Sequence, residues 1–345
     1  MFRFLKNIFG LNQKVRDKAP RAEVSLPSTQ FPRTMLIDQF NSRPWQAKLD
    51  IDHLFFKYLF GTSAGDAERS DNSLDEKEKA IILALEEVCQ SELAGSNLVP
   101  RVPYIVPQIL KSLRDDNVSN SELAFHIAKD LVLVSELIHE VNTAHYSPNQ
   151  KVINLDKAVQ LLGQNGLRLL VAKVAFRPIF NIQSGKFSKE ITPKLWDHAE
   201  KCSLACRALT RGRKQNHFAG FLAGLVQNVG LVVASRVVDY MCEDSARPTS
   251  AAFEKALLTK ARELTYRIAE EWDFPEDVLF ALRGQLRHHD DLSDLSLSLR
   301  QADQLSKIYL LVQAKQLDED DPLLLLDQDA KIEACYRDMA LVKEE

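Results

Sequence analysis

The chain has 345 residues and a formal net charge of −4, and 45% of its residues are hydrophobic and 27% charged. This composition is typical of an ordinary globular protein, and the length allows one large domain or two modest ones. Because the net charge is small and negative, it gives no electrostatic reason to expect a nucleic-acid partner.

Charge is concentrated at the two ends of the chain. Residues 1–22 hold six bases and one acid, whereas residues 318–345 hold ten acids and three bases. Such ends are usually solvated tails. The first ten residues, MFRFLKNIFG, are interrupted by Arg3 and Lys6 and are unlike a signal peptide. A weak contact of this segment with a membrane stays open as an alternative.

Two further features bear on where the protein works. We find no apolar run that approaches the roughly 18–20 residues needed to span a bilayer, so no transmembrane segment is expected. The five cysteines are odd in number and lie mostly in helical apolar patterns. The cysteine count and pattern favour reduced thiols in the cytoplasm.

The long helical patterns predict an all-α protein. Residues 1–30 have weak periodicity and are interpreted as a basic flexible arm. Residues 31–97 form an N-terminal helical region with helical patterns at 45–60 and 74–93. Prolines at 100, 103 and 107 then mark a new start.

Residues 98–290 contain a series of helical patterns. Apolar residues recur at helical spacing from 123 to 141. Residues 155–176 read as a short helix, a Gly-rich turn at 163–166 and a second helix. Further patterns cover 195–209, 220–238, 253–272 and 275–289, and an amphipathic pattern follows at 295–313. Residues 291–345 are interpreted as an acidic helical C-terminal tail, with a last helix at 321–343.

The pattern at 220–238 predicts a central buried helix with two amides, Gln227 and Asn228, in its middle. Buried amides need hydrogen-bond partners, because an unsatisfied amide is costly in an apolar interior. This pair is therefore the first candidate for a functional or structural polar centre.

The order of these features resembles the HDOD family, the degenerate relatives of the HD-domain metal phosphohydrolases. The motifs are the Pro-rich LVPRVPYIVPQIL, then LVLVSELIHEVNTA, INLDKAVQLLGQNGLRLLV, LWDHAEKCSLACRAL, FLAGLVQNVGLVV and AEEWDFPEDVLFAL. They run from about residue 98 to residue 289. The resemblance implies an HD-superfamily helical bundle, here with an extra N-terminal helical region and a C-terminal helical tail.

Within that resemblance, Gln227 and Asn228 take the place of the His-Asp pair. In an HD enzyme, imidazole and carboxylate bind a divalent metal that activates water and polarises a phosphoryl group. Uncharged amides are poor substitutes, although they can still form hydrogen bonds. His198 matches the family's first His, whereas Ala261 stands where relatives often place another. We therefore expect no catalytic residue, no metal and no cofactor.

Each candidate also has a structural interpretation. His198 on its apolar stripe is more often a hydrogen-bonded core residue. His198, Cys202 and Cys206 lie in a row that does not converge on a metal, so the cysteines are interpreted as small core residues. His288 and His289 are interpreted as a solvated helix end.

The resemblance implies a non-catalytic, cytoplasmic bacterial signalling adaptor that acts through protein partners or self-association. One alternative is a nucleotide or cyclic-dinucleotide sensor that uses the vestigial pocket, lined by His198, Gln227, Asn228, His288 and His289. Another is a residual metal-dependent phosphohydrolase. The flanking regions, 31–95 and 291–345, are expected partner surfaces.

Overall fold

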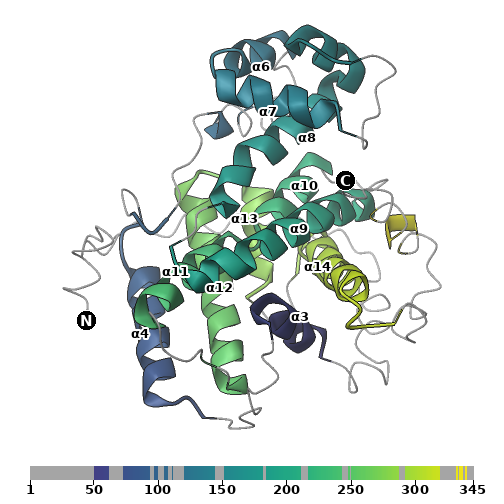
Figure 1. Cartoon of the computed structure of the whole chain (residues 1–345). Helices are drawn as coiled ribbons and strands as arrows, with labels where there is room; N and C mark the ends of the chain where they lie inside the picture. Colours follow the sequence, from purple (N-terminus) through teal and green to yellow (C-terminus); the bar gives the residue numbers. More distant parts are fainter. Residues whose placement is uncertain are drawn as a thin grey trace.

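The chain folds into a bundle of α-helices (Figure 1), seen here in a computed structural model. The structure describes residues 50–61, 73–93, 97–99, 105–107, 111, 120–143, 151–181, 184–210, 217–242, 248, 250–286, 292–318, 332, 334–336 and 339. These residues contain no β-strand. The prediction of an all-α fold is confirmed, whereas the basic arm, most of the acidic tail, His288 and His289 lie outside the described residues.

The N-terminal region supplies two helices, as its periodicity predicts. α3 spans Ile51–Phe60 and begins at Asp50, whose side chain accepts a hydrogen bond from the backbone nitrogen of His53 at 3.1 Å. α4 spans Glu76–Gln90 and begins with a capping box between Asp75 and Glu78. Both starts satisfy backbone N–H groups that a helix leaves unpaired.

The apolar stripe from 123 to 141 belongs to two helices, α6 at Asn120–Ile127 and α7 at Leu131–Val141. Asp130 separates them because its carboxylate accepts hydrogen bonds from the backbone nitrogens of Val132 and Leu133, both at 3.0 Å. This capping starts a new helix and changes which face is buried. Leu131, predicted to belong to the apolar face, is 82% exposed.

α8 and α9 are the two longest helices. α8 spans Leu155–Phe180, but the backbone at Gly163 is not helical (φ 63°, ψ −176°), so two helical segments meet there at the predicted Gly-rich turn. α9 spans Lys186–Leu209 and begins earlier than its pattern predicts. Asp239 of a later helix accepts hydrogen bonds from the backbone nitrogens of Phe187 at 2.7 Å and Ser188 at 3.0 Å. A cap supplied from so far along the chain is not visible in local sequence.

The predicted central helix is two helices, α10 at His217–Val226 and α11 at Val229–Cys242, separated at Gln227 and Asn228. Taken together, residues 217–242 are long and apolar enough to span a membrane, judged by length and composition alone. The statement that no apolar run approaches this length was therefore wrong, whereas the absence of a transmembrane segment stays an expectation. The most apolar stretch of this segment is 94% buried inside the protein, as expected for a core helix.

The remaining helices are α12 at Ala251–Glu271, α13 at Glu276–Gly284 and α14 at Asp294–Gln313. The predicted apolar face of α12 is confirmed, with Phe253, Leu257, Leu264 and Ile268 all buried. α13 begins after Pro275, which suits a helix start because proline has no N–H to leave unpaired.

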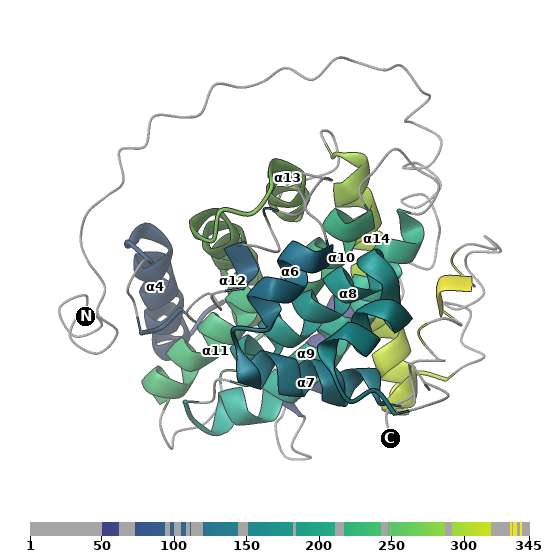
Figure 2. The same cartoon turned by 90° about the horizontal axis from the view of Figure 1, so that it is seen from above.

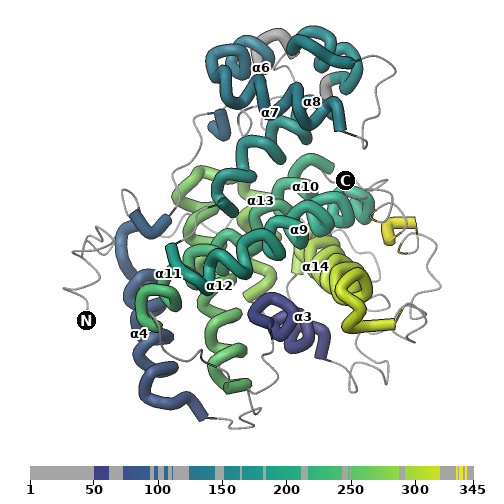
Figure 3. Tube along the Cα trace, in the orientation of Figure 1, coloured from purple at the N-terminus to yellow at the C-terminus, as the bar shows by residue number. Residues whose placement is uncertain are grey.

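Helices from the whole described chain pack into one main apolar cluster. α9 packs on α10 and α14, α11 packs on α12, and α4 lies against α11 and α12. α6, α7 and the start of α8 stand out from the rest of the bundle (Figures 1 and 3), and α6 and α7, which pack on α8, lie in front of the bundle when it is seen from above (Figure 2). α3 and α14 share this core with residues 98–290, and the four-part domain division stays a prediction.

Candidate functional site: a charge-balanced polar centre

Two glycines place the amide pair between neighbouring helices. A Cβ on Gly224 of α10 would lie 2.6 Å from the carbonyl oxygen of Cys202 in α9. A Cβ on Gly230 of α11 would overlap the carbonyl oxygen of Ala261 and lie 2.5 Å from the nitrogen of Thr265, both in α12. Backbones this close need glycine. Gln227 and Asn228 lie between the two contacts, so they are brought toward both α9 and α12.

The amides hydrogen-bond to the neighbouring helices. The Asn228 amide nitrogen lies 2.7 Å from Nδ1 of His198, and the Gln227 amide nitrogen donates to the Cys202 sulfur at 2.7 Å. The hydroxyl of Thr265 donates to the backbone carbonyl oxygen of Gln227 at 2.9 Å. The polar groups at the helix break are thereby satisfied inside an apolar core.

His198 is fully buried and joins the same network. Its Nε2 lies 3.0 Å from the Ser306 hydroxyl and 3.3 Å from a carboxylate oxygen of Asp303, both in α14. Because Asn228 donates to Nδ1, Nε2 is left to carry the proton and donate. This geometry fits the interpretation of His198 as a hydrogen-bonded core residue.

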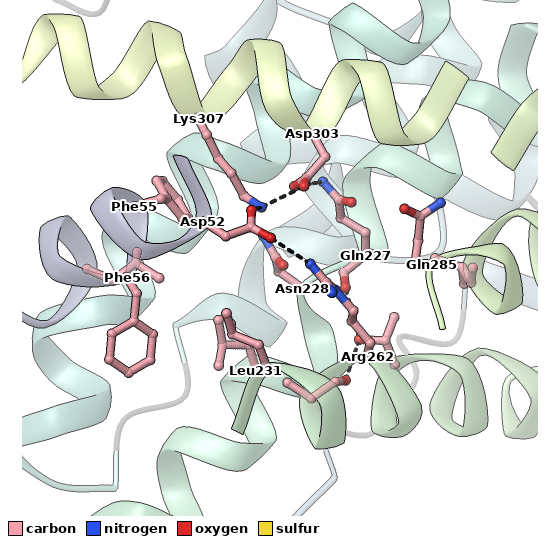
Figure 4. A pocket seen from close by; sticks show the side chains of 15 residues that line it. Asp52, Phe55, Phe56, Gln227, Asn228, Leu231, Arg262, Gln285, Asp303 and Lys307 are labelled. Carbon is pink, nitrogen blue, oxygen red and sulfur yellow. Dashed lines mark hydrogen bonds and ion pairs between the residues drawn. The ribbon is translucent and has the colours of Figure 1, made fainter. Parts of the chain in front are cut away.

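Four charged side chains complete the centre (Figure 4). The ammonium of Lys307 lies 2.6 Å from one oxygen of Asp303 and 2.7 Å from one oxygen of Asp52. The guanidinium of Arg262 lies 3.2 Å from the other oxygen of Asp52. Asp52 comes from α3, Arg262 from α12 and the other two from α14. Two carboxylates thus meet two cations from three separate helices.

Electrostatics keep these groups charged. The cation of Lys307 lowers the pKa of Asp52 against the opposing effect of burial. Burial alone would raise the pKa of Asp303, but Lys307 and then His198 outweigh it and the pKa is lowered. Burial likewise opposes the charge on Lys307, yet Asp303 and Asp52 raise its pKa. Each charge persists because its neighbours have the opposite sign.

Little empty space remains at this centre. The cavity volume is about 40 Å³. It is lined by residues of five helices, of the break between α10 and α11 and of the end of α13: Asp52, Phe55, Phe56, Leu59, Gln227, Asn228, Leu231, Leu258, Ala261, Arg262, Thr265, Leu282, Gln285, Asp303 and Lys307. Such a volume holds roughly three waters, whereas small-molecule pockets are usually ~300–1,000 Å³. Ligand binding by Gln227 and Asn228 therefore stays a prediction that would require the centre to open.

The residues present do not fit a hydrolytic metal ion. Three or more His, Cys, Asp or Glu side chains are nowhere grouped for metal binding in the part of the chain that the structure describes. The ammonium of Lys307 already lies between Asp52 and Asp303, where it supplies the positive charge. Ala261 lines the cavity without offering a ligand. Burial also raises the pKa of Cys202 and of Cys206, which keeps both thiols protonated and poor as ligands.

The sequence indicated three of the seven polar residues of this centre. It singled out His198, Gln227 and Asn228, which the structure brings together, and it missed Asp52, Arg262, Asp303 and Lys307. One signal was present, because Asp303 and Lys307 lie four residues apart within the amphipathic pattern 295–313 and can pair on one helix face. Nothing local could indicate that Asp52 joins them.

The fold is that of an HD-type helical protein, and its buried centre holds amides and a balanced set of charges. The family model for the HDOD domain matches residues 99–290, which is more than half of the chain. The chain therefore belongs to the HDOD family. α3 and α14, which supply Asp52, Asp303 and Lys307, lie outside the matched range.

Comparisons with solved structures agree on the fold. An HDOD domain protein of unknown function from Geobacter sulfurreducens is 20% identical with a TM-score of 0.55, over 77% of this chain and 90% of that one. A protein from Shewanella amazonensis SB2B, named "Putative metal-dependent phosphohydrolase", is 17% identical with a TM-score of 0.54, over 78% and 100%. At these identities the likeness concerns the fold alone.

A curated relative from Treponema pallidum (strain Nichols), named "Uncharacterized protein", is 22% identical over 202 residues. The match covers 56% of this chain and 38% of that protein, so the chain spans well under half of the relative's length.

Proposed function

We propose that this chain is a non-catalytic, cytoplasmic regulatory protein of bacterial signalling that acts through contacts with other proteins. The observation that carries the proposal is the content of the polar centre. By the resemblance, Gln227 and Asn228 take the His-Asp position, and in the structure the ammonium of Lys307 lies between two carboxylates. Hydrolysis by an HD-type site needs a metal that activates water, and this arrangement favours a structural centre instead.

Exposed apolar side chains support a protein partner. Phe125 is 61% exposed, Leu131 82% and Val132 72%, and all three belong to α6 and the start of α7. Large apolar side chains gathered on a surface are typical of interaction sites. A structural neighbour from Marinobacter aquaeolei VT8 with a TM-score of 0.50 is named "Putative signal transduction protein".

The non-catalytic role predicts no metal and no turnover. The protein would be purified anaerobically from cells supplied with iron and manganese, and its metal content measured. Hydrolysis of bis-p-nitrophenyl phosphate would be followed with added Mn²⁺, Fe²⁺, Mg²⁺ or Zn²⁺. We expect less than about 0.1 metal ion per chain and no rate above background, because a bound divalent ion would have to displace the Lys307 ammonium.

His198→Ala is the matched control, since it removes the family's retained His. Any trace metal or activity that is equal in both proteins comes from contamination. Stoichiometric metal in the wild type that is lost in His198→Ala, or turnover that depends on His198, would show a residual phosphohydrolase and contradict the proposal.

A partner that uses α6 and α7 should depend on their exposed side chains. We expect a Leu131→Asp/Val132→Asp variant to lose proteins that the wild type retains after cross-linking in cells, because a charge at an apolar contact opposes desolvation. Lys157→Asp, an exposed change on nearby α8, is the control and should retain the same proteins. Equal retention by all three chains would remove the support for this surface.

A further inference from the structure

α3 meets the rest of the protein as a bound helix would. It packs mainly on α9 and α14, and its side chains also reach α12. We propose that the groove formed by α9, α12 and α14 is a docking site for an amphipathic helix of a partner protein, and that α3 is the internal occupant of that site. This inference rests on the proposed function, because the partner that it names is a protein.

The apolar contact has the spacing of a helix seated in a groove. Phe55, Phe56, Leu59 and Phe60 follow Asp52 by three, four, seven and eight residues, which places all of them on one face. Leu59 is fully buried and Phe55 is 4% exposed. The Phe55 ring lies 4.8 Å from the ring of His198, centroid to centroid. The polar centre therefore forms part of the floor of the groove.

The charged contact lies at the N-terminal end of the same face. Asp52 belongs to the first turn of α3, and its carboxylate receives Lys307 at 2.7 Å and Arg262 at 3.2 Å. The amide of Gln304 adds a third donor at 3.4 Å. Within the described part of the chain, Arg262 forms its ion pair with Asp52. Without an acidic group from α3, Arg262 loses this ion pair and Lys307 keeps only the pair with Asp303.

A further lysine meets the opposite end of the helix. Nζ of Lys194 in α9 donates to the carbonyl oxygens of Tyr58 at 2.6 Å and Leu59 at 3.0 Å. Carbonyls in the last turn of a helix lack intrahelical donors, and a cation there is favourable. With cations for an acid at the first turn and a lysine at the last, the groove selects the direction and the length of the helix that it holds. A partner helix of about ten residues with an acid one turn before its apolar anchors fits both ends.

A partner helix is a better occupant than α3 of a second copy. The chain's own α3 is attached to the domain, so its effective concentration is on the order of millimolar, and an identical helix from another molecule has no advantage over it. A partner sequence can gain affinity through stronger helix propensity or better anchors. To displace α3, the partner helix must bind the groove more strongly than α3 binds at its effective concentration.

The test uses the full-length protein with α3 weakened by an Asp52→Lys substitution, which directs a cation at Arg262 and Lys307. The probe is a fluorescent peptide of residues 50–61, and binding is measured by anisotropy. We expect the Asp52→Lys chain to bind this peptide at least about tenfold more tightly than the wild type, because its own helix competes less well. Glu76→Lys, an equivalent change in the exposed first turn of α4, should behave as the wild type does.

A second peptide that carries Asp52→Lys tests the charge contact, and the Asp52→Lys chain should bind it at least about tenfold more weakly than the natural peptide. If Asp52→Lys does not fold, Asp52→Asn carries the same comparison. Equal binding by both chains, binding by neither, or no preference for the acidic peptide overturns the proposal. A wild-type dimer in light scattering that is lost with Asp52→Lys would assign the groove to a second copy instead. None of these outcomes bears on metal content or turnover, so the proposed function is judged separately.

Discussion

Replacement of Lys307 by methionine should lower the free energy of unfolding by about 3–5 kcal/mol, the range for removing one partner of a buried ion pair. Lys307 is 7% exposed, and its ammonium contacts both Asp303 and Asp52. Methionine fills a similar volume, so the loss of stability comes mainly from the carboxylates of Asp303 and Asp52, which no longer have the ammonium beside them. The Asp303 side chain is only 13% exposed and would keep neutral donors in place of a cation.

Urea unfolding followed by circular dichroism would measure this loss. Lys79→Met is the matched control, because Lys79 is 57% exposed and its pair with Glu76 lies on the surface of α4. Exposed pairs contribute little to stability, because water and salt screen them. If Lys307→Met costs no more than the control, the centre is screened by solvent and the charge network does not stabilise the fold.

The pH dependence of the same variant has a definite sign. In the wild type the pKa values of Asp52 and Asp303 are lowered, so their contribution is present above the unfolded pKa near 3.8 and is lost as the pH falls below it. The raised pKa of Lys307 adds stability that is lost only as the pH rises above 10.5. Without Lys307, burial raises the pKa of Asp303 and protonation relieves its charge. The stability gap between wild type and variant should therefore narrow as the pH falls from 7 toward 4.

Alanine at Gly230 should cost about 1–3 kcal/mol or more, the range for overpacking a core. The added Cβ would overlap the carbonyl oxygen of Ala261. Backbone cannot move aside as a flexible side chain can, so α11 and α12 must separate. Because Asn228 and Gln227 immediately precede this contact, their hydrogen bonds should also be disturbed.

Two comparisons identify the cause of that loss. Gly163→Ala meets no atom within 4 Å, but its φ of 63° and ψ of −176° lie in a region essentially restricted to glycine, so it should cost about 1–3 kcal/mol of backbone strain without a clash. Adding Thr265→Ala to Gly230→Ala should not restore stability, since the overlap with the Ala261 carbonyl remains. Thermal melts of the three variants measure both effects, and rescue by Thr265→Ala would show that the hydroxyl, rather than the backbone, sets the helix spacing.

The helices themselves were largely predictable from sequence, because burial of one face leaves a periodic pattern. The errors arose where one residue changed the backbone within an unbroken apolar pattern. Asp130 divides α6 from α7 by capping, and Gln227 and Asn228 divide α10 from α11. The apolar period continues across both breaks, so the pattern alone cannot reveal them.

The polar centre was only half predictable for a different reason. His198, Gln227 and Asn228 are unusual residues on apolar faces, which makes them visible in the sequence. Asp52 lies on a helical pattern that also holds Asp50, and its partners Arg262 and Lys307 are more than 200 residues away. Which of many surface-like charges becomes buried is decided by tertiary packing, which the sequence pattern does not record.

The cation between Asp52 and Asp303 is a side chain of the protein itself, the ammonium of Lys307. A metal ion dissociates, exchanges with competing metals and is withdrawn by chelators, so a site built on it follows the supply of that metal. The ammonium of Lys307 is synthesised with the chain and lies between Asp52 and Asp303 at a fixed stoichiometry of one. Its charge is insensitive to the redox state and to metal starvation. A centre neutralised in this way does not depend on the supply of dissolved metal ions.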